Sequence, residues 1–227
     1  MRKISILFVL IAGIFSLTSC LKDDEGTYPD AAGVAVVNAY PIESNLYFLI
    51  GGRELPNYAG QYKTYTGFYA IPGNKNFKVF NGLSNELLID TTMNFVDSLS
   101  YATFVYGEAG KPMFLRAKDE ALKDLGTKSA ARFFHFGNKA GKVNLSIDNQ
   151  DITAFKNRVR ESSQTVENTE KFQVVNSGTY TITVTDETGR QLVKKENVEF
   201  QAGKYVNIML LGTLDDNKFP LELGVIY

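Results

Sequence analysis

The chain has 227 residues and carries 24 lysines and arginines against 25 aspartates and glutamates, giving a formal net charge of −1. It has no clustered basic excess, which excludes the electrostatic footprint of a nucleic-acid-binding protein. The length exceeds one typical domain and therefore predicts two. Because only one cysteine is present, no disulfide can form within the chain, and 16 Phe and 12 Tyr must supply much of the hydrophobic core.

The first twenty residues have the pattern of a processing signal. A short basic start precedes an apolar run from Ile4 to Leu17 that is too short to span a bilayer. This pattern is typical of a cleaved secretory signal peptide, predicted here over residues 1–19. The Leu-Thr-Ser-Cys sequence at 17–20 resembles the lipobox of bacterial lipoproteins. The resemblance implies that Cys20 becomes the new N-terminus, with a diacylglycerol on its thiol and an acyl chain on its amine.

An acylated Cys20 predicts a membrane partner without a membrane span, because two acyl chains already anchor a protein stably. Residue 21 is Leu, not the Asp that resembles an inner-membrane retention signal. The acidic run 23–25 resembles a surface-export signal of Gram-negative commensals, although a solvated spacer is the simpler alternative. We therefore expect residues 20–32 to be a flexible tether and the protein to be lipid-anchored in the outer membrane, exposed on the cell surface.

Residues 33–117 have the pattern of an all-β domain. Runs rich in β-branched and aromatic residues alternate with turn signals about every ten residues. The turns include Gly51-Gly52 and Asn81-Gly82, and the second is the strongest short hairpin signal. The expected strands are 34–39, 46–50, 77–80, 87–91, 101–106 and 113–117. This spacing predicts an antiparallel β-sandwich of the immunoglobulin-like type.

The pattern then breaks and restarts. Residues 118–129 contain helix formers followed by a glycine, and we expect a linker there with a short helix of one or two turns. Over 130–227, six elements recur in the same order at an offset of roughly 100 residues. The sequence thus predicts two tandem antiparallel β-sandwiches, in which Asn38 and His135 occupy equivalent positions.

Alternation differs between the two copies. In the second copy, Val143, Leu145 and Ile147 alternate with polar residues, so one face should be buried and the other solvated. In the first copy, the run 46–50 is apolar on both faces. We expect this run to pack its outer face against the second copy or against a partner.

Four stretches of the chain resemble the domain-of-unknown-function 4397 family. They are the Val-Val-Asn-Ala-Tyr-Pro run at 36–41, the Gly51-Gly52 turn, the Tyr65 to Gly73 run, and the Phe200 to Tyr205 run. The resemblance implies an exported, often lipidated protein built from β-sandwich repeats, with no assigned chemistry. The second copy departs from the pattern at its entry, where Gly137-Asn138 stands in place of Tyr40-Pro41.

No constellation of reactive residues supports catalysis, a metal or a cofactor. His135 is the only histidine, and with Cys20 acylated no free thiol remains for a catalytic pair or a zinc site. Because an asparagine occupies the equivalent position in the first copy, we expect His135 to tie its strand to the following loop. The oxygen-rich segments 148–151 and 215–217 fit turns better than Ca²⁺ sites. The carboxylates placed to serve a hydrolase are Glu43, Asp90, Asp97 and Glu108, and nothing in the sequence pairs any two of them.

Four tyrosines, Tyr58, Tyr62, Tyr65 and Tyr69, are the candidate ligand-binding residues. Tyrosine offers a flat apolar face with a polar tip, which suits sugar rings and peptides. The alternative is that these side chains are half-buried in strands and loops of the first sandwich. The corresponding region of the second copy, 151–170, is polar and is expected to be a solvated surface excursion.

The sequence therefore predicts a lipid-anchored, non-catalytic binding module of the outer membrane or cell surface, with a glycan or protein as its ligand. One alternative is a fimbrillin-like pilus or adhesion subunit, for which Arg53 is the obvious processing site and an exchangeable first strand is required. A surface hydrolase is the third interpretation, and it requires two carboxylates that converge in a cleft.

Overall fold

The structure is a computed structural model that describes residues 30–148, 150 and 152–227. The predicted signal peptide, Cys20 and residues 20–29 of the tether lie outside the described residues. Ala31–Tyr227 forms one compact unit. Within the described part of the chain, no helix is both long and apolar enough to cross a bilayer. Nearly all regular structure in it is β-strand, which confirms the predicted all-β class.

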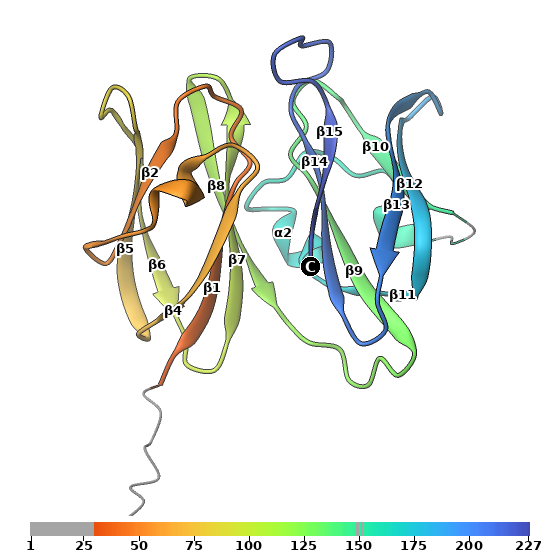
Figure 1. The fold of residues 1–227 in the computed structure, drawn as a ribbon, viewed down its shortest axis with the longest axis horizontal. Coiled ribbons are helices and arrows are strands. Elements are labelled where there is room, and N and C mark those ends of the chain that lie inside the picture. Colours follow the sequence, from red (N-terminus) through yellow and green to blue (C-terminus); the bar gives the residue numbers. More distant parts are fainter. Residues whose placement is uncertain (1–29, 149, 151) are drawn as a thin grey trace, which may run out of the picture. The chain divides into compact units, whose positions relative to one another are not determined.

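The first sandwich consists of two four-stranded sheets (Figure 1). One has the order β4-β1-β7-β8 and the other the order β3-β2-β5-β6. The strands are β1 (Ala32–Asn38), β2 (Leu46–Ile50), β3 (Arg53–Glu54), β4 (Tyr65–Ala70), β5 (Gly73–Asn81), β6 (Leu87–Phe95), β7 (Ser100–Glu108) and β8 (Lys111–Asp119). A single 3-10 turn, η2 (Asn57–Gly60), lies between β3 and β4.

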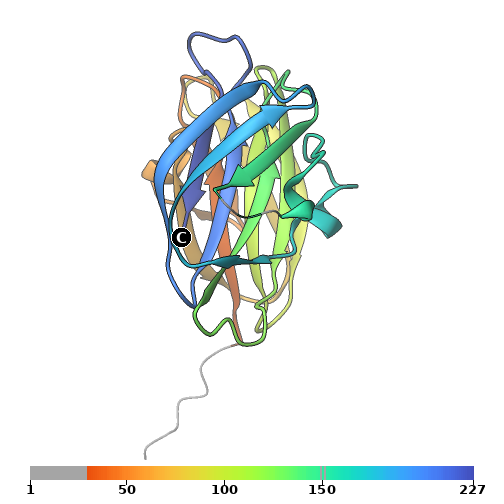
Figure 2. The same ribbon diagram turned by 90° about the vertical axis from the view of Figure 1, so that its right-hand side faces the viewer.

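The second sandwich pairs a four-stranded sheet, β11-β9-β14-β15, with a three-stranded sheet, β10-β12-β13. Figure 2 shows the three-stranded sheet in front, its strands running obliquely to those behind, as twisted sheets do when they pack face to face. The strands are β9 (Lys128–His135), β10 (Val143–Ile147), β11 (Gln173–Asn176), β12 (Gly178–Asp186), β13 (Gln191–Phe200), β14 (Tyr205–Leu211) and β15 (Glu222–Ile226). Two short helical turns, η3 (Thr153–Phe155) and α2 (Val166–Thr169), lie between β10 and β11.

Each sandwich has its own hydrophobic core, and the two cores share no residue. In the first, the rings of Phe48 and Phe77 stack with centroids 6.2 Å apart. In the second, Val143, Leu145 and Ile147 of β10 are buried, as their alternation with polar residues predicts. Such cores replace the disulfides that the chain cannot form.

The two sandwiches share one topology. β1 pairs antiparallel with β4 and parallel with β7, and β9 pairs in the same way with β11 and β14. The ends of the strands correspond as well: the Ala39 amide donates to the Val105 carbonyl, and the Phe136 amide donates to the Leu210 carbonyl. Asn38 and His135 each directly precede these amides, so the structure places them at equivalent positions.

The segment between the sandwiches does not contain the expected helix. β8 continues to Asp119, and residues 120–127 are irregular, with a turn at 126–127, before β9 begins. Two left-handed residues, Asp124 at φ 50° and Gly126 at φ 52°, turn the chain there. The backbone N–H and C=O of Leu122 bond the Tyr205 hydroxyl instead of a helical neighbour, at 2.8 and 3.2 Å. Tertiary hydrogen bonds thus outweigh the local helix propensity.

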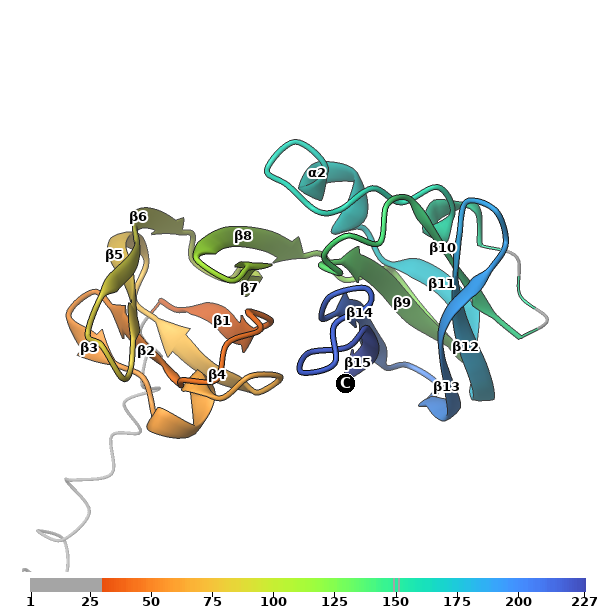
Figure 3. The same cartoon turned by 90° about the horizontal axis from the view of Figure 1, so that it is seen from above.

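A third hydrophobic cluster joins the two sandwiches. It lies between the β4-β1-β7-β8 and β11-β9-β14-β15 sheets, which form the two inner layers of four in Figure 3. The Phe104 ring of β7 lies 4.7 Å from Phe134 and 4.9 Å from Phe136 of the second sandwich. The outer face of the first copy therefore packs on the second, but the run 46–50 expected to do so belongs to the other sheet and takes no part.

The expectation of a solvated excursion at 151–170 is wrong for its central residues. Phe155 is buried in the second core, and Glu161 is buried outright. The Glu161 carboxylate pairs with Arg158 at 2.5 Å and accepts hydrogen bonds from the hydroxyls of Thr165 and Thr169 at 2.7 and 2.9 Å. A buried carboxylate satisfied in this way makes a polar sequence part of the interior.

Candidate functional site

The four candidate tyrosines do not form one cluster. Tyr58 lies in η2, and its side chain is outside the described part of the structure. Tyr62 packs against the third hydrophobic cluster, with its ring edge-on to Phe219 at 5.5 Å. Through these contacts Tyr62 helps to join the two sandwiches.

Tyr65 and Tyr69 lie on the same face of β4, and Gly67 lies between them on that face. Tyr65 is 48% exposed and Tyr69 is 80% exposed. The register places Tyr69 beside Gly33 of β1, so no large side chain covers its ring on that side. These two rings are free to contact a partner, and their participation in ligand binding stays a prediction.

His135 ties the end of its strand to the loop that follows, as the sequence predicts. Its Nε2 lies 2.9 Å from the Gly141 carbonyl. The pKa of His135 is lowered to about 4, chiefly by burial and to a smaller extent by the charges of Arg158 and Arg160, while the hydrogen bond to Gly141 opposes the shift. Asn38 does the equivalent work in the first sandwich: its amide donates to the Gly60 carbonyl at 2.7 Å, and its Oδ1 accepts from the Tyr40 amide at 3.0 Å.

Each carboxylate considered for hydrolysis has a separate partner. Their partners are Lys218 for Glu43, Lys78 at 3.1 Å for Asp90, the Ala31 amide at 2.9 Å for Asp97, and Arg160 at 3.4 Å for Glu108. Among residues 30–148, 150 and 152–227, no three His, Cys, Asp or Glu side chains are grouped to hold a metal ion.

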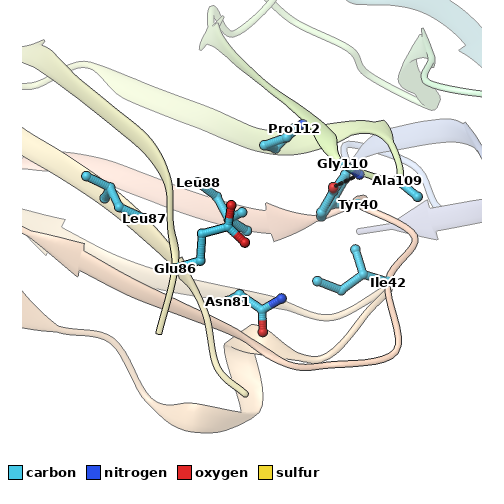
Figure 4. A pocket seen from close by; sticks show the side chains of 9 residues that line it. All are labelled: Tyr40, Ile42, Asn81, Glu86, Leu87, Leu88, Ala109, Gly110 and Pro112. Atoms are coloured by element: carbon cyan, nitrogen blue, oxygen red, sulfur yellow. Dashed lines mark hydrogen bonds between the residues drawn. The ribbon is translucent and has the colours of Figure 1, made fainter. Parts of the chain in front are cut away.

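A pocket of about 310 Å³ lies at the end of the first sandwich opposite the start of β1 (Figure 4). We call it the distal pocket. Three connections meet there: the loop after β1, the β5–β6 hairpin and the β7–β8 hairpin. Its lining residues are Tyr40, Ile42, Asn81, Glu86, Leu87, Leu88, Ala109, Gly110 and Pro112.

Local hydrogen bonds fix the three connections. The Asn81 Oδ1 accepts from the amides of Leu83 and Ser84 at 2.9 and 3.2 Å, which shapes the β5–β6 hairpin. The Tyr40 hydroxyl accepts from the Gly110 amide at 2.8 Å, joining the first loop to the β7–β8 hairpin. Burial raises the pKa of Tyr40, and the nearby Glu86 carboxylate raises it too. The Asn81 side chain and the Tyr40 hydroxyl therefore hold the three connections in place through hydrogen bonds within the protein.

The distal pocket presents polar and apolar surface in similar amounts, and Glu86 is the one charged side chain in its lining. Figure 4 shows Ile42 and Glu86 extending into the space between the β5–β6 hairpin and the loop after β1, with Pro112 across from them. Glu86 is exposed and forms no ion pair with a described residue. The Tyr40 ring is buried, so it offers no open face for a sugar to stack on.

The sequence analysis did not single out Tyr40 or Glu86 as binding residues. The Asn81-Gly82 turn signal located the hairpin correctly, but no local pattern brings residues 40, 86 and 110 together. That requires the register of β1, β5 and β7 in two different sheets. Spatial convergence of loops is a property of the whole sandwich.

A second concavity of about 330 Å³ lies between the two inner sheets, near the start of β7. We call it the intersheet cleft. It is lined by Ser100, Asp119, Ala121, Phe172, Tyr205, Asn207 and Tyr227. The rings of Phe172 and Tyr205 form an aromatic wall of the cleft and pack edge-to-face, with their centroids 4.8 Å apart.

A buried arginine holds the polar residues of the intersheet cleft. Arg132 pairs with Asp119 through Nη2 and donates from Nε to the Asn207 Oδ1 at 2.7 Å. It also donates to the carbonyls of Lys118 and Glu170 at 2.8 and 3.0 Å. Burial lowers the pKa of Arg132, and Asp119 opposes that effect. Because the guanidinium is only 1% exposed, it works as a clamp between the sandwiches.

Comparison with known proteins shows the family of the chain. No curated protein matches it. Among solved structures it is similar to a family 26 carbohydrate-binding module from Eubacterium rectale Amy13K, crystallised in complex with maltoheptaose. That likeness covers 86% of this chain and 96% of the other, at 8% identity and a TM-score of 0.27. A family model described as "Domain of unknown function (DUF4397)" matches residues 32–146, more than half of the 227 residues and the whole first sandwich, and the chain therefore belongs to the DUF4397 family.

Proposed function

We propose that this chain is a lipid-tethered, non-catalytic binding protein of the outer membrane or cell surface, and that the distal pocket is its ligand site. The lipobox-like sequence ending at Cys20 supports the tether. The position of the pocket supports the site, because β1 begins at the opposite end of the first sandwich. A ligand in the pocket would bind at the end of the first sandwich opposite the point where the tether joins it.

The ligand that fits the distal pocket is a protein segment with an apolar side chain next to a basic one. Ile42, Leu88 and Pro112 give the pocket an apolar wall, and Glu86 gives it the one negative charge. Leu87 at the rim is 46% exposed, and nearby Leu83 is 86% exposed. Exposed apolar side chains around a concavity are typical of a protein contact.

A peptide-display selection against the immobilised lipidated protein tests this proposal. We expect enriched peptides to pair an apolar with a basic residue, and Glu86→Gln to weaken their binding about tenfold, which corresponds to 1.4 kcal/mol. The matched control is Glu199→Gln, an exposed carboxylate on β13 of the second sandwich. No enrichment, or equal binding by wild type and Glu86→Gln, would contradict the pocket as the ligand site.

A glycan in the intersheet cleft is the second candidate. The observation that favours it is the combination of Phe172, Tyr205 and Tyr227 with three polar side chains, because aromatic faces and hydrogen-bonding groups together suit a sugar. A glycan array compares wild type with Tyr227→Ala and with Tyr69→Ala, which removes an exposed candidate tyrosine outside the cleft. Glycan binding lost only in Tyr227→Ala would favour the cleft over the distal pocket.

The pilus-subunit alternative meets a topological difficulty. β1 lies between β4 and β7 and bonds to both, and β2 pairs with β5. Cleavage at Arg53 would remove both β1 and β2 from the first sandwich, one strand from each sheet. Laddered oligomers in surface extracts would nevertheless support that alternative.

A further inference from the structure

The end of the first sandwich at which β1 begins carries a surface distinct from both concavities. Ala32 of β1 pairs with Ala70 of β4, and the β4–β5 turn that follows begins with Ile71. The Ala31 carbonyl accepts from the Ser98 amide at 3.1 Å. The tether therefore joins the folded unit beside this turn.

Two large apolar side chains stand out at this end. Tyr69 is 80% exposed and Ile71 is 73% exposed. They flank a small pocket of about 170 Å³ that is lined by Ile50, Gly51, Arg53, Phe68, Tyr69, Ala70, Ile71 and Lys75. We call these residues the proximal corner. Exposed aromatic and aliphatic side chains around an apolar depression are the kind of surface that enters the boundary between headgroups and acyl chains.

The charges at the proximal corner are positive. Arg53 and Lys75 line the depression, and neither forms an ion pair with a residue that the structure describes. Two acids on neighbouring segments are already engaged. Glu54 hydrogen-bonds with Tyr47, whose pKa it raises, and Asp97 accepts from the Ala31 amide. Two cations beside an apolar tip match the phosphates and acyl chains of an anionic phospholipid surface.

We propose that the proximal corner contacts the phospholipid surface to which the chain is tethered, with Ile71 and Tyr69 entering the interface and Arg53 and Lys75 facing headgroup phosphates. This inference rests on the proposed lipidation of Cys20. Cys20 precedes Ala31 by eleven residues, which span at most about 40 Å, so the corner is within reach of the membrane. Such contact fixes the sandwich with the distal pocket turned outward.

The chain contains no tryptophan, so one introduced tryptophan reports its own environment. The full lipidated protein is reconstituted in vesicles of phosphatidylethanolamine and phosphatidylglycerol that contain brominated acyl chains. Ile71→Trp places the reporter on the proximal corner. Leu83→Trp is the matched control, because Leu83 is 86% exposed at the opposite end of the same sandwich. We expect quenching at least threefold stronger for Ile71→Trp, with a shift of its emission to shorter wavelength.

Further arms separate the outcomes. Adding Arg53→Ala and Lys75→Ala to Ile71→Trp should reduce the quenching about twofold, and uncharged phosphatidylcholine vesicles should lower it similarly. Protein that floats with the vesicles but shows equal quenching at both positions overturns the corner and leaves the tether standing. Protein that does not float, with an unmodified thiol by mass spectrometry, overturns both. If the emission of both tryptophans is shifted equally to shorter wavelength in the absence of lipid, a second copy of the chain or a protein partner covers them. That result would also overturn the proposal.

Discussion

Apart from β3, which has no counterpart among the described strands of the second sandwich, the two sandwiches have the same strand order, and their loops differ at the end that carries the distal pocket. Gly107 and Gly212 end β7 and β14 at equivalent points, and both need glycine, since a Cβ would lie 2.3 Å from the Lys111 carbonyl oxygen in one and 2.1 Å from the Pro220 carbonyl oxygen in the other. After Gly107 the chain makes a tight hairpin. After Gly212 it makes a longer loop before β15.

That loop fills the corresponding place in the second sandwich. In the second sandwich Gly137 stands where the first has Tyr40, and a Cβ there would lie 3.0 Å from the side chains of Leu210 and Leu221. The loop after Gly212 therefore occupies the space that the first sandwich leaves open. The two copies therefore differ in what they add to a common topology. The first has a pocket at its end, and the second has buried charged residues that bond to both sandwiches.

The largest expected effect tests the bracing role. Arg132 is equivalent to Ala35 of the first copy, so the clamp is specific to the second. We expect Arg132→Leu to lower the free energy of unfolding by about 3–5 kcal/mol, because it leaves the Asn207 side chain and the carbonyls of Lys118 and Glu170 without their donor. Urea denaturation measures this.

The matched control is Arg116→Leu. The Arg132 guanidinium lies 4.3 Å from the centre of the Phe172 ring, and Arg116 similarly lies 4.8 Å from that of Tyr101, but Arg116 is partly exposed. Its loss should cost less than about 1 kcal/mol. Similar losses for both variants would contradict the clamp.

The next largest effect is the pH dependence of stability that arises from His135, the residue equivalent to Asn38 of the first sandwich. The folded pKa of His135 is about 4, against about 6.5 in an unfolded chain, so between these values the unfolded state binds more protons. Stability must therefore fall as pH decreases from 6.5 to 4, by roughly 3 kcal/mol for this group. In His135→Asn, which copies the first sandwich, that part of the pH dependence should vanish. Unfolding curves of both proteins from pH 7 to pH 4 test it, and parallel profiles would contradict the prediction.

Sequence pattern predicted those parts of the fold that depend on neighbours along the chain. The alternation at 143–147 and the Asn81-Gly82 turn are local, and both were confirmed. The run Phe133 to Phe136 is apolar on both faces because β9 is covered by its own core and by the first sandwich. The run 46–50 is also apolar on both faces, and we expected it to pack against the second sandwich. That expectation is wrong, because β2 contributes to the core of the first sandwich and not to the third hydrophobic cluster.

Charged residues were the harder case. Arg132 and Glu161 are almost fully buried, yet nothing beside them in the sequence distinguishes them from solvated residues. Their partners lie across the fold or in an irregular loop: Asp119 and Asn207 for Arg132, Thr165 and Thr169 for Glu161. Satisfaction of a buried charge is a tertiary property, and so is the convergence of loops that makes the distal pocket.

A smaller effect is expected at Asn38, which ties the first loop to β1 and positions Tyr40. Asn38→Ala leaves the Gly60 carbonyl and the Tyr40 amide unpaired, and we expect it to lower the free energy of unfolding by about 1–3 kcal/mol. Because Tyr40 lines the distal pocket, peptides selected against wild type should also bind this variant more weakly. The corresponding His135→Asn variant should leave their binding unchanged. Equal weakening by both would argue against the pocket.

The smallest expected effect separates the tyrosines that were candidates together. Tyr65→Ala and Tyr69→Ala should each change the free energy of unfolding by less than about 0.5 kcal/mol, because their rings lie exposed on β4. Tyr62→Ala should cost about 1–2 kcal/mol, because the Tyr62 ring fills space against Phe219 and the third hydrophobic cluster. Urea curves for the three variants decide the matter. If Tyr69→Ala destabilises the fold as much as Tyr62→Ala, Tyr69 is a packing residue; if it does not, the Tyr69 ring is available for a contact outside the chain.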